Sequence, residues 1–473
     1  MALSIKSVAG MINEPPIFSN LNITKKTTNT ISLEWTLTDL DLTICRQYLI
    51  LNGQKKEISK EIGYEKVDNK FTYTISGLAQ GTIYQIKLEA TDGHDVAMSD
   101  LLNVQTERKY IYGVKVNESN SNPETSVTYI EDAIGITPAT PTSLGGWADK
   151  WPFNEIKMVG FKAGKVTKEI NPFNKTHYKD GEAVPHDVDV MVKFPKIYWK
   201  FTSTYDGFEV RISNQKVDST WDCYAHKVNG NERDFIYIGA YEGYVENSKL
   251  RSISGVTPTG NLSLNNARKY AQNVGQGYKL NPFLRLQLRQ ILFIINYKNL
   301  NSQLALGKGA VNTTLTNTGG TNTKGLNFGT QDAKIQVSFL GIEDVYGNLK
   351  EYVDGIWIRI STRKHHVQFN NVNFNSTGNG YTDTQIYGFY DAGYINKTVC
   401  NNKIGFIPQT VKGSATTYYS DFSQYTAMGE DRPPTHGESF NSEQMAGIFS
   451  LNFREAGAGA NAEDVGARLC YLG

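Results

Sequence analysis

Hydrophobic and polar side chains alternate with a period of two through the first hundred residues of the chain. The alternation is clear at residues 31–35 and 84–90, and turn signals such as Asn52-Gly53 separate the alternating runs. A period of two places the apolar side chains of a strand on one face, and regularly spaced turns connect such strands into a sandwich. We therefore predict a β-sandwich over residues 13–107.

In the longer second part of the chain, the pattern of hydrophobic residues changes from that of strands to that of helices and then back to short strands. Dense β-formers at residues 188–201 predict strands, and two helices are expected next. Ser263 is expected to cap the first helix, while Asn281 is expected to cap the second, with Pro282 at its first position. Apolar residues recur at helical spacing in the second helix and predict one apolar stripe: Leu284, Leu288, Ile291, Leu292 and Ile295. Short strands in Gly- and Asn-rich sequence follow, so the fold class is mainly β with an α+β C-terminal domain.

Composition and charge exclude several classes of protein. The 473 residues include 27 Tyr, 21 Phe and 6 Trp, which argues against intrinsic disorder. With 48 basic and 47 acidic side chains, the net charge of +1 argues against nucleic-acid binding, which depends on Lys and Arg. Apolar residues make up only 39% of the chain, so we expect a polar, aromatic surface rich in loops.

Neither export nor membrane insertion is indicated by the apolar runs of the chain. The first ten residues hold no run long enough for a secretory signal, and the longest apolar run, residues 291–295, is too short to cross a bilayer. The cysteines at positions 45, 223, 400 and 470 form no CxxC pair. Free thiols are the simpler interpretation, and a disulfide between Cys400 and Cys470 stays open as the alternative.

The first module carries features of a known domain family. Leu78 and Tyr84 are spaced as in a tyrosine corner, in which the Tyr hydroxyl bonds to the chain just upstream. Together with Pro15-Pro16 and the buried-type Trp35, this spacing resembles a fibronectin type III domain. The resemblance implies a spacer or adhesive module.

The second part resembles the C-type-lectin fold, in the variant shared by formylglycine-generating enzymes and phage tail proteins. The resemblance rests on the Gly-Asn-x-x-Glu segment at 347–351 and on the closing Gly-Ala-Arg-Leu-Cys at 466–470. Residues 412–421 and 446–452 are similar to the C-terminal ligand-binding domains of phage receptor-binding proteins. Residues 146–153 also resemble that class.

These resemblances imply four parts of the chain. An N-terminal attachment segment at 1–12 precedes the fibronectin type III module at 13–107. A β-rich lead-in at 108–240 precedes the C-type-lectin-like ligand-binding domain at 241–473.

The implied function is recognition of a host-cell surface, without catalysis, by the tail of a phage or of a related particle. The expected partners are a bacterial cell-surface glycan or surface protein and other tail or baseplate proteins, and the resemblance implies a homotrimer. The protein would be made in the bacterial cytoplasm without a signal peptide and would act in the virion tail. We expect neither nucleic-acid binding nor membrane insertion.

The resemblance places the ligand face in the C-terminal region, where Tyr and Phe offer flat faces and Asn, Ser and Gly offer adaptable hydrogen bonds. The candidate ligand-binding residues are Tyr418, Tyr419, Tyr425, His436, Glu438, Phe440, Asn441, Ser442, Gln444, Asn452, Phe453, Arg454, Glu455, Asn461 and Glu463.

An acidic cluster supports two alternatives. A glycoside hydrolase needs two carboxylates a short distance apart, and the cluster around Glu343–Asp354 makes a polysaccharide-degrading tail enzyme the alternative function. Calcium prefers carboxylate and amide oxygens, and relatives of this fold often hold it, so calcium is the possible cofactor. Its candidate ligands are Glu343, Asp344, Asn348, Glu351 and Asp354. Formylglycine-generating activity is not expected, because the chain has no close pair of cysteines.

Overall fold

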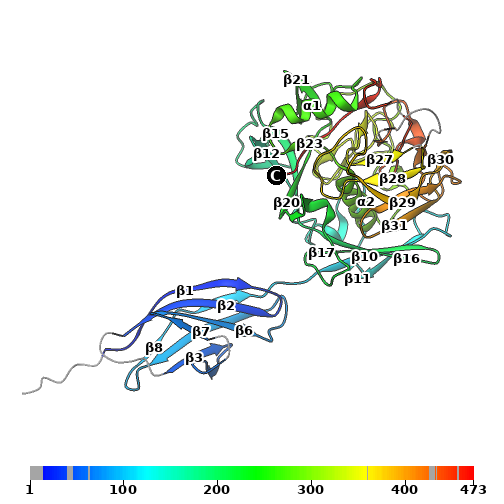
Figure 1. The fold of residues 1–473 in the computed structure, drawn as a ribbon. Coiled ribbons are helices and arrows are strands. Elements are labelled where there is room, and N and C mark those ends of the chain that lie inside the picture. The colour runs from blue at the N-terminus through cyan, green and yellow to red at the C-terminus, as the bar shows by residue number, and fades with distance from the viewer. Residues whose placement is uncertain are drawn as a thin grey trace, which may run out of the picture. The chain divides into compact units, whose positions relative to one another are not determined.

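The computed structural model describes residues 14–39, 46–61, 64–359, 361–425, 432, 434–454 and 457–473. The predicted attachment segment at 1–12 and Cys45 lie outside these residues. The chain divides into two compact units, Met1–Lys109 and Tyr110–Gly473, and each is described here by itself (Figure 1). As predicted, the fold is mainly β with a few helices.

The first unit is a sandwich of two antiparallel sheets, as the alternating pattern predicts. One sheet has the order β1-β2-β6-β5, and the other has the order β4-β3-β7-β8 with β9 also paired to β7. The strands are β1 (Ile17–Lys26), β2 (Thr30–Thr38), β3 (Arg46–Leu51), β4 (Gln54–Glu57), β5 (Glu65–Val67), β6 (Lys70–Ser76), β7 (Ile83–Thr91), β8 (Val96–Met98) and β9 (Leu102–Gln105).

The core and the corner of this sandwich match the sequence-based expectation. Trp35 is fully buried, stacks on Phe71 with ring centroids 6.0 Å apart, and donates from Nε1 to Oε1 of Gln47 at 2.9 Å. The hydroxyl of Tyr84 accepts a hydrogen bond from the backbone N–H of Ala79 at 2.8 Å. This bond confirms the tyrosine corner, which ties β7 to the turn before it.

The second unit is built on a seven-stranded sheet with the order β14-β13-β12-β15-β20-β36-β23. The chain's last strand, β36, lies between β20 and β23. Strands from the predicted lead-in and from the predicted lectin-like domain therefore share one sheet. Its strands are β12 (Lys157–Lys162), β13 (Lys165–Asn171), β14 (Asn174–Tyr178), β15 (Asp189–Pro195), β20 (Phe235–Gly239), β23 (Tyr278–Leu280) and β36 (Leu469–Tyr471).

Smaller sheets surround this one. A four-stranded sheet has the order β11-β10-β17-β16, formed by β10 (Ile111–Asn117), β11 (Val127–Glu131), β16 (Tyr198–Thr204) and β17 (Gly207–Ser213). The remaining strands pair in twos and threes. They are β18 (Lys227–Val228), β19 (Asn231–Glu232), β21 (Tyr244–Glu246), β22 (Lys249–Arg251), β24 (Ser338–Phe339), β25 (Ile342–Glu343), β26 (Lys350–Tyr352), β27 (Ile356–Arg359), β28 (Lys364–Val367), β29 (Thr382–Tyr387), β30 (Ala392–Tyr394), β31 (Lys397–Asn401), β32 (Gly405–Thr410), β33 (Phe422–Gln424), β34 (Thr435–His436) and β35 (Val465–Gly466).

The first predicted helix agrees with the structure. Helix α1 spans Leu264–Val274, and Oγ of Ser263 accepts from the backbone N–H of Asn266, which confirms the predicted cap. A short third helix, α3, spans Ser302–Ala305.

The second helix corrects two expectations. Helix α2 spans Phe283–Tyr297, and Pro282 rather than Asn281 stands at its N-cap position. The predicted single apolar stripe is wrong, because every residue of α2 is buried, including Arg285 and Arg289. The helix contacts β10 and β32 and lies within the unit (Figure 1). A helix surrounded by protein buries its polar residues as well as its apolar ones.

The described cysteines are free thiols, so Cys400 and Cys470 do not pair. Cys470 is buried on β36, where Nη1 of Arg285 lies 2.6 Å from its sulfur, and Cys400 lies 3.6 Å from Oγ of Ser203. In the described part of the chain, no helix combines the length and the apolar character needed to cross a membrane.

Candidate functional site

The predicted ligand face divides into accessible and buried residues. Exposed or half-buried residues are Tyr418, Phe440, Asn441, Gln444, Arg454, Asn461 and Glu463. The prediction of direct ligand contact is wrong in this structure for the buried ones, which are Tyr419, Tyr425, His436, Glu438, Ser442, Asn452 and Phe453. Glu455 lies outside the described residues.

The buried aromatic candidates belong to the core. Tyr425 stacks on Phe389 with ring centroids 4.1 Å apart, and Phe453 meets Tyr425 edge-on at 4.7 Å. Tyr419 packs edge-on against Phe449 at 5.4 Å, and its hydroxyl donates to Oε1 of Glu118 at 2.7 Å. The aromatic content of this region therefore stabilises packing.

The buried polar candidates hold the loops together. Glu438 accepts from Nδ2 of Asn452 at 2.5 Å and from Oγ of Ser442 at 3.2 Å, and Nη2 of Arg454 lies 3.7 Å away. Burial raises the pKa of Glu438, although Arg454 opposes the shift. His436 is held between the backbone carbonyls of Ser450 and Val345. These side chains position the accessible residues around them.

The acidic motif is joined to the closing motif of the chain. Glu351 accepts from Nε of Arg468 at 2.5 Å, and Nη2 of Arg468 donates to the backbone carbonyls of Glu343 and Asp344. Burial opposes ionisation, yet the Arg468 guanidinium holds the pKa of Glu351 below its usual value. The two sequence motifs are thus joined by one buried ion pair. Parallel pairing of β26 with β35 joins them as well.

The other acidic candidates also have partners within the fold. Glu343 accepts from the backbone N–H groups of Gly319 and Thr321, and Asp354 forms a bidentate ion pair with Arg268. Nδ2 of Asn348 donates to Glu242 at 2.7 Å and lies 3.2 Å from Asp344.

This arrangement does not favour calcium or hydrolysis at the cluster. Nδ2 of Asn348 donates between the carboxyl groups of Glu242 and Asp344, and the predicted acidic ligands do not form a close group of ligand atoms among the described residues. Burial, together with the neighbouring acid, raises the pKa values of Glu242 and Asp344 well above their usual range. Glu343, Asp344 and Glu351 are each at most 3% exposed, so these carboxylates are not accessible to a polymer, while both oxygens of Asp354 are held by Arg268.

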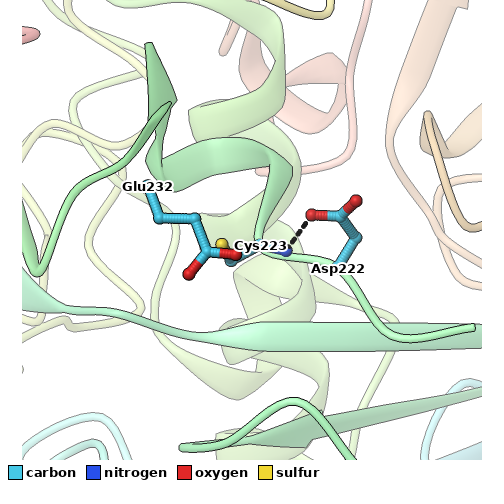
Figure 2. A group of neighbouring side chains, drawn as sticks. All are labelled: Asp222, Cys223 and Glu232. Carbon is cyan, nitrogen blue, oxygen red and sulfur yellow. Dashed lines mark hydrogen bonds between the residues drawn. The ribbon is translucent and has the colours of Figure 1, made fainter. Parts of the chain in front are cut away.

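A different group brings metal-ligand atoms within 4.8 Å of one another among the described residues: Asp222, Cys223 and Glu232 (Figure 2). Asp222 accepts from Nζ of Lys227 at 2.7 Å, and Glu232 accepts from the hydroxyl of Tyr198 at 2.5 Å. Burial and the neighbouring carboxylates raise the pKa of the Cys223 thiol to about 12. Asp222 and Glu232 are thus already engaged by Lys227 and Tyr198, and we base no proposal on this group.

Several clefts of the described larger unit are open to solvent, and two of them bear on function. The first has a volume of about 430 Å³ and is lined by Ser121, Asn122, Pro123, Glu124, Asn301, Leu304, Thr416 and Thr417. The backbone N–H of Tyr418 donates to the carbonyl of Ser121 at 2.8 Å, which joins two distant segments of the chain at this cleft. Most of its lining residues carry polar side chains, Leu304 and Pro123 add apolar surface, and its one charged side chain is Glu124.

The second cleft has a volume of about 240 Å³ and lies between α1, β23 and the loop before β29. It is lined by Arg268, Gln272, Lys279, Leu280, Asp354, Asn373 and Phe374. Sequence reasoning missed both clefts, because their walls come from segments far apart in the chain. The Asn-rich run at 370–379 was the one local signal for the second cleft.

A third pocket of about 170 Å³ is lined in part by Lys175 and Ser254. Nζ of Lys175 is buried and donates to Oγ1 of Thr321 at 3.2 Å and to Oγ of Ser338 at 3.4 Å. Burial lowers the pKa of Lys175 to about 8, although Glu343 opposes the shift. The folded protein therefore holds a buried ammonium group at neutral pH.

This buried amine predicts a pH-dependent stability. The unfolded pKa is about 10.4, so between pH 8 and 10.4 the unfolded chain binds more protons and the stability of the fold rises with pH. Lys175→Met should remove this rise, which amounts to at most about 3 kcal/mol. Urea unfolding of both proteins at about pH 7 and pH 10.5 measures it. The exposed Lys165→Met is the control; an equal rise in the wild type and Lys175→Met would contradict the expectation.

Comparisons with known proteins add little. No family model matches the chain, and no curated protein sequence matches it. A family 28 exopolygalacturonase of Yersinia enterocolitica is 15% identical over 20% of each chain, with a TM-score of 0.16, so this chain spans about a fifth of that enzyme. The titin domains Z1Z2 in complex with telethonin are 15% identical over 43% of this chain and 95% of theirs, with a TM-score of 0.19. TM-scores this low support no conclusion about fold or function.

Proposed function

We propose that the chain is a receptor-binding protein of a phage tail or tail-like particle, which binds a bacterial cell-surface glycan without turning it over. The observation that carries the proposal is the first cleft. Thr416 and Thr417, which line it, belong to the segment 412–421 that resembles the ligand-binding domains of phage receptor-binding proteins. We therefore place the proposed ligand site at this cleft instead of at the buried part of residues 436–464.

The chemistry of the cleft suits a neutral or weakly charged sugar. Hydroxyl and amide groups of Ser121, Asn122 and Thr416 can exchange hydrogen bonds with sugar hydroxyls, and the exposed Leu304 offers an apolar wall. Tyr418, which follows the cleft in sequence, is half-buried and can extend it. Small polar groups of this kind adapt their hydrogen bonds to a ligand.

Assembly belongs to the same proposal. A homotrimer within the virion tail would bring three weak sites to one cell surface, and avidity would then strengthen binding without new contacts. The fibronectin type III-like sandwich would serve as a spacer, with other tail or baseplate proteins as partners.

A cell-binding experiment tests the function and the cleft together. We expect the purified chain to bind intact cells of some strains in a bacterial panel, and to bind their isolated surface polysaccharide without releasing reducing sugar. Thr416→Trp places an indole in the cleft from an exposed position. It should weaken this binding at least about tenfold, which corresponds to about 1.4 kcal/mol. Flow cytometry and a reducing-end assay are the measurements.

Thr323→Trp is the matched control, since Thr323 is also exposed and lies outside the lining of the cleft. It should bind cells as the unchanged chain does, with the same thermal unfolding midpoint. Equal binding by Thr416→Trp would remove the cleft from the proposal. Binding to no strain or polysaccharide would overturn the function itself, and release of reducing ends would favour a hydrolase.

A further inference from the structure

The second cleft carries a positive charge that the fold leaves uncompensated. Arg268 is neutralised by Asp354, whose two oxygens accept from Nε at 2.8 Å and from Nη2 at 2.7 Å. Lys279, on β23, is half-buried and has no ion pair with any described residue. The cleft therefore presents a free ammonium group beside a neutral ion pair.

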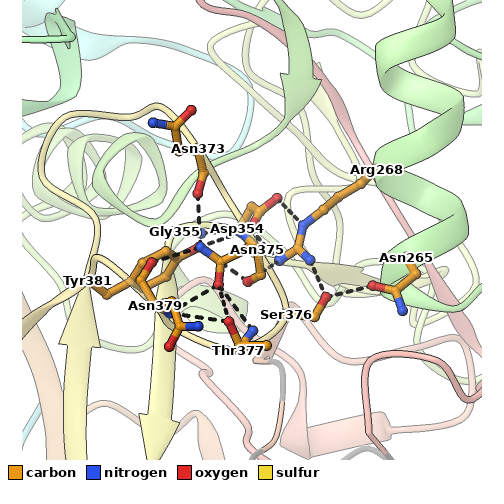
Figure 3. Close-up of polar contacts among 10 residues, drawn as sticks. All are labelled: Asn265, Arg268, Asp354, Gly355, Asn373, Asn375, Ser376, Thr377, Asn379 and Tyr381. Atoms are coloured by element: carbon orange, nitrogen blue, oxygen red, sulfur yellow. Dashed lines mark hydrogen bonds and ion pairs between the residues drawn. The ribbon is translucent and has the colours of Figure 1, made fainter.

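The wall opposite α1 is held rigidly (Figure 3). Oδ1 of Asn375 accepts from the backbone N–H groups of Thr377 and Asn379, both at 3.1 Å, and its Nδ2 donates to the carbonyl of Asn373 at 3.0 Å. Arg268 clamps this loop to α1, because it donates to the carbonyl of Asn375 at 3.1 Å and to Oγ of Ser376. A wall fixed before binding lowers the entropic cost of holding a ligand.

Phe374 gives this rigid wall an apolar face. A Cβ atom at Gly355 would lie 2.9 Å from Cε1 of Phe374, so the ring packs directly on the glycine backbone, whose φ is +77°. The ring is half-buried and lines the cleft together with the amides of Gln272 and Asn373. A phenyl ring, two amides and a cation thus line one small, mainly polar space.

We propose that this cleft binds an anionic saccharide unit, with its carboxylate or phosphate at Lys279 and its ring against Phe374. Sugar hydroxyls would bond to the amides of Gln272 and Asn373. The inference rests on the proposed function and deepens it: the surface polymer would contain acidic or phosphorylated sugars. The volume of about 240 Å³ suits one monosaccharide unit.

The test uses monosaccharides in solution with the full chain. Ligand-observed NMR titrations with glucuronate, galacturonate, glucose 6-phosphate and glucose give one affinity for each. We expect binding of at least one anionic sugar and weaker binding of glucose, with a preference that falls as salt rises. The uronates and the sugar phosphate distinguish a carboxylate ligand from a phosphate ligand.

Lys279→Gln should weaken binding of the preferred anion about fivefold or more and remove its advantage over glucose. Lys249→Gln is the matched control, because it removes the same charge from an exposed lysine outside the cleft. Phe374→Leu should weaken every sugar that binds, while the preference for anions stays. Equal binding of glucose and the anions, or unchanged binding by Lys279→Gln, would overturn the inference.

The two proposals fail separately. Cell binding without any anion preference among the monosaccharides would overturn the inference and leave the receptor-binding function standing. Monosaccharide binding at Lys279 without binding to any cell or polymer would support the cleft and overturn the cell-surface function.

Discussion

Replacing Arg468 with methionine is expected to destabilise the larger unit by about 3–5 kcal/mol, the largest single effect in that unit. The substitution keeps most of the side chain's volume and leaves a buried Glu351, a residue 3% exposed, with Arg289 at 3.9 Å as its remaining ion-pair partner. The guanidinium also donates to the carbonyls of Gly239, Glu343 and Asp344, which would lose those bonds. Urea unfolding followed by circular dichroism measures the loss.

A surface ion pair of similar length provides the control for Arg468→Met. Nζ of Lys168 lies 2.5 Å from Glu182, but both side chains are about half exposed. Lys168→Met should therefore change stability far less than Arg468→Met does, because an exposed ion pair is screened by solvent. Comparing the two variants shows whether the loss of stability depends on the burial of the ion pair or on its length. A loss for Arg468→Met as small as that for Lys168→Met would show that the buried pair does not hold the two motifs together.

Replacing Trp35 with alanine is expected to lower the free energy of unfolding of the first unit by about 3–5 kcal/mol. The effect should be confined to that unit. Trp35 is fully buried, and its removal leaves a cavity against Phe71 and an unpaired acceptor on Gln47. Units with separate cores unfold separately. Calorimetry should therefore show one transition moved to lower temperature or lost, with the transition of the larger unit unchanged.

Ile83→Ala is the control for Trp35→Ala, because Ile83 lies in the same sandwich and is 61% exposed. Its effect should stay within about 0.5 kcal/mol. A Trp35→Ala protein in which both transitions move by the same amount would contradict the division of the chain between Lys109 and Tyr110.

Local signals predicted much of the secondary structure. The alternation around Trp35 predicted β2, whose side chains alternate between buried and half-buried along its length. Ser263 predicted the start of α1, and the spacing of Leu78 and Tyr84 predicted a hydrogen bond that the structure contains. Each of these features depends on residues a few positions apart, so their physical cause is present in the local sequence.

Burial was harder to predict. The apolar residues of α2 suggested one buried face, but Arg285 and Arg289 on the other faces are buried as well. Tyr425 and Phe453 have the composition of a sugar-binding surface, yet they pack on each other in the core. The type of a side chain determines what it can bind. Only the surrounding fold determines whether that side chain contacts solvent or packs against another side chain.

The sequence by itself determined the mainly β architecture, the N-terminal sandwich and the start of α1, because periodicity, turns and caps act over short distances. The tertiary structure alone decided that Glu351 meets Arg468, that the acidic candidates are buried, and that two clefts open elsewhere. Those outcomes depend on which distant segments lie side by side. The free charge of Lys279 beside the neutralised Arg268 is of this kind, since an ion pair exists only where the fold brings its two partners together.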